Sequence, residues 1–335
     1  MKFAVGYQLY KDCSFVDAIL RHKDRISEVY FSMYNSPSGR GNSWSAGVNG
    51  FDAKNAQEKE LSVLKENGIK TNLLLNATCY GKDALSRAFF NETGDMIEYC
   101  VEKFGTVSVT TTSPVIAKFV KQNFDDVSTR ASVNMEIGTV EGMEYVKKYF
   151  DSFYMKREYN RDFEHIKILK KWCDDNGKKM HLLANSGCLN NCSCHFFHDN
   201  IVAHENEISR MDNAFLFSGI CKEYLADEEN IYKLPQIMNF VRPEDIHLYE
   251  EYFEAAKLAT RVSKNPVRVL ESYMNAKYRG NILEILEPAH NIYPYVLENG
   301  EKQKIVKIAE DVAVFDDNSS CTGNCSSCSE KCNKQ

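Results

Sequence analysis

The sequence Asn185-Ser-Gly-Cys-Leu-Asn-Asn-Cys-Ser-Cys-His195 directly follows an apolar run, Met180-His-Leu-Leu-Ala184. A short apolar run of this kind is typical of a buried β-strand, so the cysteines lie on the loop that leaves the strand's carboxyl end. In α/β proteins, catalytic and binding groups gather at the carboxyl ends of the strands. The stretch therefore indicates both a fold class and a candidate site.

The same alternation of apolar and amphipathic segments runs through most of the chain. Strands are expected at Phe3–Gln8, Val29–Ser32, Thr71–Asn76, Val107–Thr112, Ser128–Asn134, Ser152–Lys156, Met180–Asn185 and Lys257–Val262. Helices are expected at Phe15–His22, Ala53–Asn67, Ala84–Phe104, Pro114–Phe124, Val140–Phe150 and Phe163–Asn176. This alternation predicts an α/β fold, a (β/α)8 TIM-like barrel over residues 1–290, with an open doubly wound sheet as the alternative. No Gly-x-Gly-x-x-Gly follows the first strand, so a dinucleotide-binding fold has no support.

Polar side chains recur where the expected strands end, and a barrel would bring them into one ring at its mouth. Turns are polar in most proteins, which is the simpler explanation for any single residue. Cations in such a ring suit a carboxylate or phosphate. The candidate catalytic residues are Lys156, Arg157, Asn185, Arg242 and Arg261. Arg242 precedes Pro243-Glu-Asp245, which has the composition of a helix start.

The alternation of strands and helices ends after the seventh strand. Residues 186–239 form a long cysteine-rich insertion there, which we expect to be an ordered lid. Four thiols in it, Cys188, Cys192, Cys194 and Cys221, are soft ligands that suit iron–sulfur clusters or zinc. Their spacing indicates a metal or cluster without naming which. A set of three, Cys188, Cys192 and Cys221, completed by another group, is equally consistent. His195 and His198 flank the run and are further candidate ligands.

A second cysteine group lies in the C-terminal extension, residues 291–335, as Cys321-x3-Cys325-x2-Cys328-x3-Cys332. Its first three cysteines have the spacing of a radical-SAM cluster motif. That motif normally follows the first barrel strand, so radical-SAM chemistry is not favoured here. The segment is too polar to fold alone, which indicates a bound metal, either a second cluster or zinc. The alternative is a flexible thiol-rich tail.

Composition limits the other possibilities. The net charge is -6, which argues against a broad polyanion-binding surface. No apolar run approaches the length of a membrane span, and the N-terminus looks like a strand and not a signal peptide. Twelve cysteines without an export signal indicate metal or redox chemistry in a reducing cytoplasm. Neither Gly-x-Ser-x-Gly nor His-Glu-x-x-His occurs, and no sequence feature pairs Cys79 with a base.

Four segments of the chain together resemble peptidase family U-32, the collagenase-like family. They are Asn185-x-Gly-Cys188-x3-Cys192, the later Cys221, Arg242-Pro-Glu-Asp245 and Lys257-Leu-Ala-Thr-Arg261. The resemblance covers residues 1–290. The core signature of that family, Glu-x-Phe-x2-Gly-Ser-x-Cys, is only partly matched by Leu183-Ala-Asn-Ser-Gly-Cys188, so this chain resembles a divergent member.

The resemblance implies a barrel-like fold and, as in the iron–sulfur branch, a 4Fe-4S cluster. Cys188, Cys192 and Cys221 match its ligands, with Cys194 or Cys79 as the fourth. It also implies oxygen-independent hydroxylation or redox chemistry on a small or RNA-borne polar substrate, served by an electron-donor protein. The alternatives are a thiol- or metal-dependent collagenase-like peptidase and a non-catalytic, metal-stapled binding protein.

Overall fold

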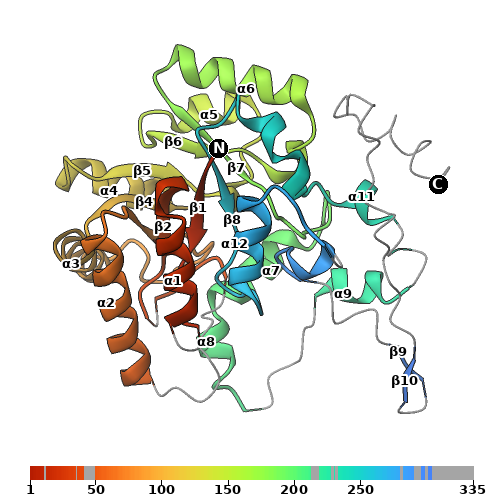
Figure 1. Ribbon diagram of the computed structural model, residues 1–335. Helices are drawn as coiled ribbons and strands as arrows, with labels where there is room; N and C mark the ends of the chain where they lie inside the picture. The colour runs from red at the N-terminus through yellow and green to blue at the C-terminus, as the bar shows by residue number, and fades with distance from the viewer. Residues whose placement is uncertain are drawn as a thin grey trace.

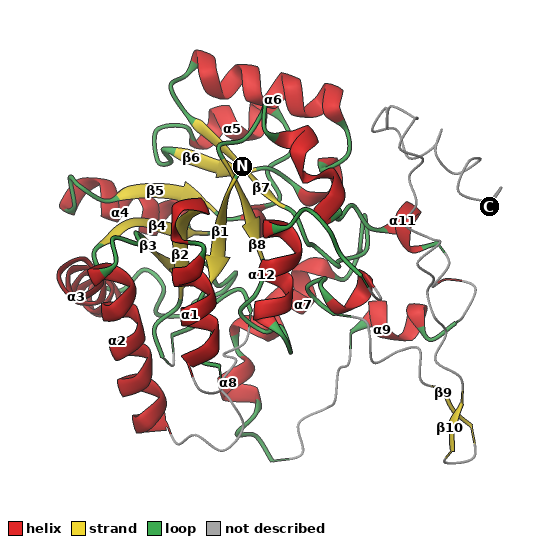
Figure 2. Ribbon diagram, in the orientation of Figure 1, coloured by secondary structure: helices red, strands yellow, loops and turns green. Residues whose placement is uncertain are grey.

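A closed barrel of parallel strands forms the centre of the molecule, and the strands follow one another around it in sequence order (Figures 1 and 2). The structure is a computed structural model that describes residues 1–10, 13–34, 36–40, 50–212, 219–227, 230, 233–279 and 282–289, with the backbone of 296–298 and 301–303. The strands are β1 (Lys2–Gly6), β2 (Ile26–Phe31), β3 (Thr71–Leu75), β4 (Thr106–Thr111), β5 (Ser128–Ala131), β6 (Ser152–Tyr154), β7 (Lys179–Leu183) and β8 (Ala255–Leu258). Pairing of β8 with β1 closes the ring. The expected (β/α)8 barrel is confirmed, and the open-sheet alternative is wrong.

The eighth strand ends at Leu258, earlier than the sequence suggested. The next backbone N–H, that of Ala259, donates to Oδ1 of Asn185 at 2.7 Å instead of to a neighbouring strand. The hydroxyl of Thr260 then accepts from the N–H of Gly6 at 2.8 Å. Arg261 consequently lies beyond the strand end, where it lines a pocket at the barrel mouth.

Helices surround the barrel, and most begin at a side-chain cap. They are α1 (Ser14–Arg21), α2 (Gly50–Glu66), α3 (Arg87–Phe104), α4 (Pro114–Asn123), α5 (Val140–Val146), α6 (Phe163–Asp175) and α12 (Pro266–Met274). Side-chain oxygens of Ser86, Ser113, Thr139, Asp162 and Asn265 accept a backbone N–H in the first turn of the helix that follows each of them. α5 is shorter than expected because the N–H of Tyr149 bonds to Val146, which tightens the chain into a turn.

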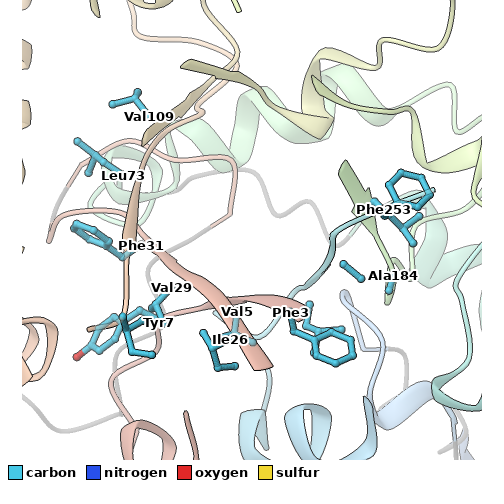
Figure 3. Packing of buried hydrophobic residues seen from close by; sticks show 14 of the residues in the cluster. Phe3, Val5, Tyr7, Ile26, Val29, Phe31, Leu73, Val109, Ala184 and Phe253 are labelled. Atoms are coloured by element: carbon cyan, nitrogen blue, oxygen red, sulfur yellow. The ribbon is translucent and has the colours of Figure 1, made fainter. Parts of the chain in front are cut away.

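Apolar side chains fill the space between the barrel and its helices (Figure 3). Phe3, Val29, Phe31 and Leu73 are fully buried there. Phe31 packs edge-on against Phe104 of α3, with ring centroids 5.8 Å apart. Each large apolar side chain buried in this way contributes about 1.5–3 kcal/mol. The hydrophobic core is therefore a shell outside the strands.

The inside of the barrel is polar toward the strand starts, unlike the branched aliphatic layers that fill most barrels of this kind. Glu28 of β2 and Arg130 of β5 meet across it as a buried ion pair, with Arg130 Nη2 3.0 Å from Glu28 Oε2. Asn72 donates to Glu28 at 3.3 Å and accepts from Thr110 at 3.0 Å. Nε of Arg130 donates to the hydroxyl of Ser152 at 3.2 Å. Hydrogen bonds therefore take the place of aliphatic packing in this part of the interior, whereas Tyr30 and Leu74 pack together toward the mouth pocket.

The insertion between β7 and β8 forms a set of short helices, α7 (His195–Ala203), α8 (Glu205–Ile208), α9 (Ile220–Leu225) and α11 (Leu234–Ile237). Strands β1 and β8 point toward the side of the barrel on which α7 and α8 lie (Figure 2). A second apolar cluster joins the insertion to the chain that follows α12, through Leu225, Leu234, Met238, Phe240, Leu283 and Leu286. Among the described residues, the insertion therefore has a small core of its own.

Short 3-10 helices complete the described chain. They are η2 (Lys23–Arg25), η3 (Val133–Met135), η4 (Arg157–Tyr159), η5 (Pro243–Tyr249) and η6 (Ile282–Glu284). The helix expected after Arg242 is thus η5. In the C-terminal extension, β9 (Val296–Glu298) and β10 (Glu301–Gln303) pair antiparallel. The tail cysteines Cys321, Cys325, Cys328 and Cys332 lie outside the described residues.

None of the helices in the described part of the chain has the length and apolar character that crossing a membrane requires.

Candidate active site at the barrel mouth

The carboxyl ends of the strands surround a small pocket of about 50 Å³, here named the mouth pocket. Its polar lining consists of Tyr30, Arg40, Asn76, Asn134, Arg157, Lys257, Arg261 and Glu287. A larger cavity of about 1000 Å³ opens at the opposite end of the barrel, among the strand starts. Catalytic groups of such barrels lie at the carboxyl ends of the strands, so the mouth pocket is the candidate active site.

Cys188, an expected cluster ligand, lies against two arginine side chains of the mouth pocket. Arg157 Nη1 donates to its sulfur at 3.1 Å and Arg40 Nη2 donates to it at 3.4 Å. Arg157 is held in place by Oδ1 of Asn134, which accepts from Nη2 at 3.2 Å. Guanidinium N–H groups are strong donors to anionic acceptors, so this sulfur has the surroundings of a functional thiol.

The other two expected ligands share electrostatic interactions with Cys188. Burial raises the pKa of the Cys221 thiol, and the nearby Cys188 and Cys192 thiols raise it further. Burial also raises the pKa of Cys192; a backbone hydrogen bond at Cys194 opposes this change, and the charges of Cys194 and Cys188 add to it. None of the eight described cysteines is in a disulfide. Within the described ranges, no three Cys, His, Asp or Glu side chains stand at the spacing of a metal site.

Arg40 and Glu287 belong to the site although the sequence did not predict them. Arg40 Nε lies 3.2 Å from Glu287 Oε1, and its Nη1 lies 3.7 Å from Oδ1 of Asp199. Burial raises the pKa of Glu287, and the positive charges of Arg40 and Arg261 offset part of that rise. Neither residue belongs to a periodic apolar segment. Their arrival at the mouth therefore depends on tertiary structure that sequence patterns do not encode.

Lys257 was predicted as a strand residue and belongs to the stretch that carries the family resemblance, but it was not predicted as a site residue. Its neighbours Ala256 and Leu258 belong to the core shell outside the strands, so alternation along β8 turns Lys257 inward. This alternation is the signal that could have identified it. Its amine lies 4.2 Å from the ring centroid of Tyr30 and 4.9 Å from that of Tyr154.

Asn185 was expected to contact substrate, but backbone groups occupy its amide. Its Nδ2 donates to the carbonyls of Ala259 at 2.9 Å and Ile285 at 2.8 Å, while Oδ1 accepts from Ala259. The side chain is fully buried and does not line the mouth pocket. Asn185 is therefore a positioning residue that ties the ends of β7 and β8 to the chain near Glu287.

Lys156 and His195, two other candidates, join a charge cluster beside the pocket. Lys156 Nζ lies 3.5 Å from Glu136 and 3.9 Å from Glu158. His195 Nδ1 lies 2.9 Å from Glu136. Burial alone would raise the pKa of Glu136, but His195, Arg157 and Lys156 together lower it. Glu136 has a φ of 53°, an uncommon conformation for a non-glycine residue, which these contacts hold in place.

Arg242 is placed away from the mouth pocket. Its Nε and Nη2 atoms donate to the carboxylate of Asp245 at 2.6 and 2.7 Å. The pair spans the first turn of η5. Arg242 is not among the residues that line the mouth pocket, and its guanidinium forms this local ion pair.

Cys79 has a base beside it, which the sequence did not reveal. The imidazole of His204, from the junction of α7 and α8, interacts with the Cys79 thiol and lowers its pKa. The same contact raises the pKa of His204, whose Nδ1 lies 3.0 Å from Oε2 of Glu207. The backbone N–H of Gly81 also donates to the sulfur at 3.4 Å. His204 and Glu207 both belong to the insertion, so no local motif could have identified them.

Fold and site together define a (β/α)8-barrel protein with a small cationic pocket beside the Cys188 thiol. In keeping with this, the chain is similar to the U32 peptidase Mk0906, with a TM-score of 0.55 at 12% identity over 77% of this chain and 92% of that one. This likeness extends to the fold alone.

Two further solved structures are more distant. One is the C-terminal domain of a proposed chitinase from Desulfitobacterium hafniense DCB-2, with a TM-score of 0.43 at 9% identity over 83% of this chain and 99% of that one. The other is an HpcH/HpaI aldolase from the same organism, with a TM-score of 0.32 at 8% identity over 64% of this chain and 95% of that one. No family model and no curated protein matches the sequence.

Proposed function

We propose that this protein is an enzyme that holds an iron–sulfur cluster beside the barrel mouth and acts on a small or RNA-borne anionic group in the mouth pocket. The observation that carries the proposal is the position of Cys188, which receives hydrogen bonds from Arg157 and Arg40 at the pocket edge. Cys192 and Cys221 interact electrostatically with it. The fold likeness to a U32 peptidase is consistent with the family resemblance of the cysteine stretch.

The donor set fits a cluster in its chemistry. Thiols are the ligands that iron–sulfur clusters use, and crowding and burial raise the pKa of Cys192 and Cys221. A bound cation would relieve that crowding by favouring the thiolates. Cys188, Cys192 and Cys221 would hold the cluster, with Cys194 or Cys79 as the fourth sulfur. When bound, the cluster supplies one-electron transfer, which an electron-donor protein would feed.

The chain's own residues bind and orient the substrate. Arg261 and Arg157 place guanidinium groups in the mouth pocket, where they attract a carboxylate or phosphate. Asn76 and Asn134 add amide groups that can hydrogen-bond to a polar substrate. The narrow pocket admits a small molecule or a single group of a larger one and excludes an extended peptide.

Replacing Cys188 with alanine tests the cluster. Protein purified without oxygen is expected to contain iron and acid-labile sulfide and to absorb visible light. Cys188→Ala should lose nearly all of that absorption, because one ligand and its two arginine contacts disappear together. Cys13→Ser, at an exposed position, is the matched control and should keep the full spectrum.

Iron content decides the outcome. Full iron loading of Cys188→Ala would refute the proposed ligand set.

A chain that ends at residue 317 lacks the four tail cysteines and tests whether the extension holds a separate metal site. We expect it to lose part of the metal and to keep the visible spectrum. Loss of all metal on this truncation would mean that the two cysteine groups form one site.

A second candidate function, thiol-dependent hydrolysis, is favoured by the contact between Cys79 and His204. The Cys79 sulfur would attack a carbonyl carbon, His204 would protonate the departing amine or alcohol, and water would then hydrolyse the thioester. Glu207 orients the imidazole, but its side chain is 72% exposed, so its contribution is small.

Iron-free protein is the material for testing this second function, with casein and denatured collagen as substrates. If hydrolysis depends on the Cys79 thiol, Cys79→Ser abolishes it and His204→Gln lowers its rate by about 100-fold or more. Glu207→Gln should lower it by less than about tenfold, because the pair is exposed. Hydrolysis that persists in Cys79→Ser, or its absence from every iron-free preparation, would exclude the thiol mechanism.

A further inference from the structure

Lys257 is an amine in the wall of the mouth pocket with no carboxylate beside it. No ion pair or hydrogen bond of its Nζ is found among the described residues, and its contacts there are the rings of Tyr30 and Tyr154. The residue is only 7% exposed. Burying a charged ammonium without a partner is costly, so the neutral amine is the form that this position favours.

The charges that face Lys257 from the surrounding strands and loops are mostly positive. Arg261, Arg130 and Arg157 act on it from beyond β8, from β5 and from beyond β6, and Glu28 acts from β2. Glu28 already forms an ion pair with Arg130, which neutralises most of its charge. Burial first, and then the arginine charges, lower the pKa of Lys257 to about 7. A lysine amine surrounded in this way is nucleophilic at neutral pH.

A second basic group in the same pocket provides an anion site. Arg261 Nη2 donates to the hydroxyls of Ser32 and Ser38, both at 2.9 Å, and to the carbonyl of Arg40 at 3.2 Å. These acceptors are neutral, and no ion pair of Arg261 is found in the described part of the chain. The Glu287 carboxylate of the same pocket interacts with Arg261 electrostatically without forming an ion pair with it. The guanidinium therefore has room for a direct contact with a ligand carboxylate.

We propose that Lys257 is a nucleophile that forms an imine with a small 2-oxo acid whose carboxylate lies on Arg261. This deepens the proposed function, on whose mouth pocket it rests, by naming the substrate class of that pocket. The pocket volume of about 50 Å³ corresponds to about four water molecules, which limits the ligand to roughly the size of glyoxylate or pyruvate.

The covalent step needs no further reactant. The lone pair of the Lys257 nitrogen forms a bond to the carbonyl carbon, and the carbonyl oxygen leaves as water with the two hydrogens of the amine. A carbon–nitrogen double bond remains, so the protein and the acid are joined without oxidation or reduction. The arginines and the tyrosine rings around the amine exclude bulk water from the bond that forms.

Reductive trapping tests the imine. Iron-free wild-type protein is incubated with pyruvate or glyoxylate and sodium cyanoborohydride, and the adduct is located by mass spectrometry of proteolytic peptides. We expect one dominant adduct, on the peptide that contains Lys257, and none on that peptide in Lys257→Met. Lys178→Met is the matched control: burial also lowers the pKa of Lys178, but its amine donates to the carbonyl of Phe150, away from the pocket.

The carboxylate contact is tested separately. Arg261→Gln should raise the pyruvate concentration that half-saturates trapping by about tenfold or more, since a hydrogen bond to a charged group is lost. Hydroxyacetone, which has no carboxylate, should show no such change. Trapping spread over surface lysines in the wild-type protein would overturn the proposal. So would equal labelling in Lys257→Met, once circular dichroism shows that variant folded.

The outcome of the trapping experiment does not depend on whether the protein holds an iron–sulfur cluster. Trapping in iron-free protein supports Lys257 even if Cys188→Ala keeps its iron and the cluster proposal fails. Conversely, a confirmed cluster with no Lys257 adduct refutes the imine alone.

Discussion

Replacing Arg130 with methionine is expected to lower the free energy of unfolding by about 3 kcal/mol, because it leaves the Glu28 carboxylate unpaired inside the barrel. Removing one partner of a buried ion pair usually costs about 3–5 kcal/mol. The lower end applies here, since Glu28 and Arg130 line the large cavity at the strand starts and solvent can reach the stranded carboxylate. In the same variant the Ser152 hydroxyl would lose its hydrogen bond from Arg130. The Asn72 amide would remain beside the unpaired carboxylate of Glu28.

The double variant Glu28→Met/Arg130→Met gives the decisive comparison. It removes both charges, so we expect it to recover most of the stability that Arg130→Met loses. Urea unfolding followed by circular dichroism measures the differences. Lys121→Met breaks an ion pair with Asp151 at the surface and should change stability by less than about 1 kcal/mol. A double variant no more stable than Arg130→Met would show that the pair is not what stabilises the interior.

Replacing Lys257 with methionine should have the opposite effect and stabilise the barrel at pH 7 by a few kcal/mol. The folded protein lowers the pKa of this lysine to about 7, and each unit below the unfolded value corresponds to about 1.4 kcal/mol. Methionine has a similar volume and no charge to desolvate, so it suits the pocket wall better. The substitution would thereby exchange a proposed nucleophile for stability, as substitutions in active sites often do.

The pH dependence of this gain has a definite sign. In the unfolded chain the lysine keeps its proton up to about pH 10, whereas in the folded protein it loses that proton above about pH 7. Between these values the unfolded state binds more protons, so raising the pH stabilises the wild-type protein. Tyr30 and Tyr154 do not titrate in this window, because burial raises the pKa of both. The stability of Lys257→Met should lack this rise with pH, because the variant has no amine at this position to lose a proton.

Urea unfolding at pH 7 and pH 9 measures the difference between the two proteins. The stability gap between Lys257→Met and the wild type should narrow as the pH rises. A gap that stays constant or widens would show that the lysine remains charged in the folded protein, and the imine proposal would lose its nucleophile.

The architecture of the barrel could be predicted because its signal is local. Apolar runs and helical periods repeat along the chain, and side-chain caps such as Ser113 and Asp162 mark where helices start. All eight strands occur close to their expected places. The error at the end of β8 arose because Asn185, just beyond the end of β7, accepts a hydrogen bond from the backbone that would have continued the strand.

The site was less predictable, because its geometry is set by contacts between distant segments. Of the polar residues expected at strand ends, Arg157 and Arg261 line the pocket. Arg40 and Glu287 come from irregular segments and meet only in the folded molecule. The base next to Cys79 comes from the insertion, and a sequence pattern cannot say where such a segment returns to the barrel.

The order in which the chain emerges from the ribosome matters for this mouth. The segment that carries Glu287 is held against the start of the insertion, since its N–H donates to the carbonyl of Asn185 at 2.9 Å and its carbonyl accepts from Gly187 at 2.8 Å. Every strand of the barrel precedes that segment in the sequence. During synthesis the ring of strands can therefore close while the wall of the pocket is still missing. The pocket is completed only when the last of these residues leaves the exit tunnel, so the pocket forms after the barrel.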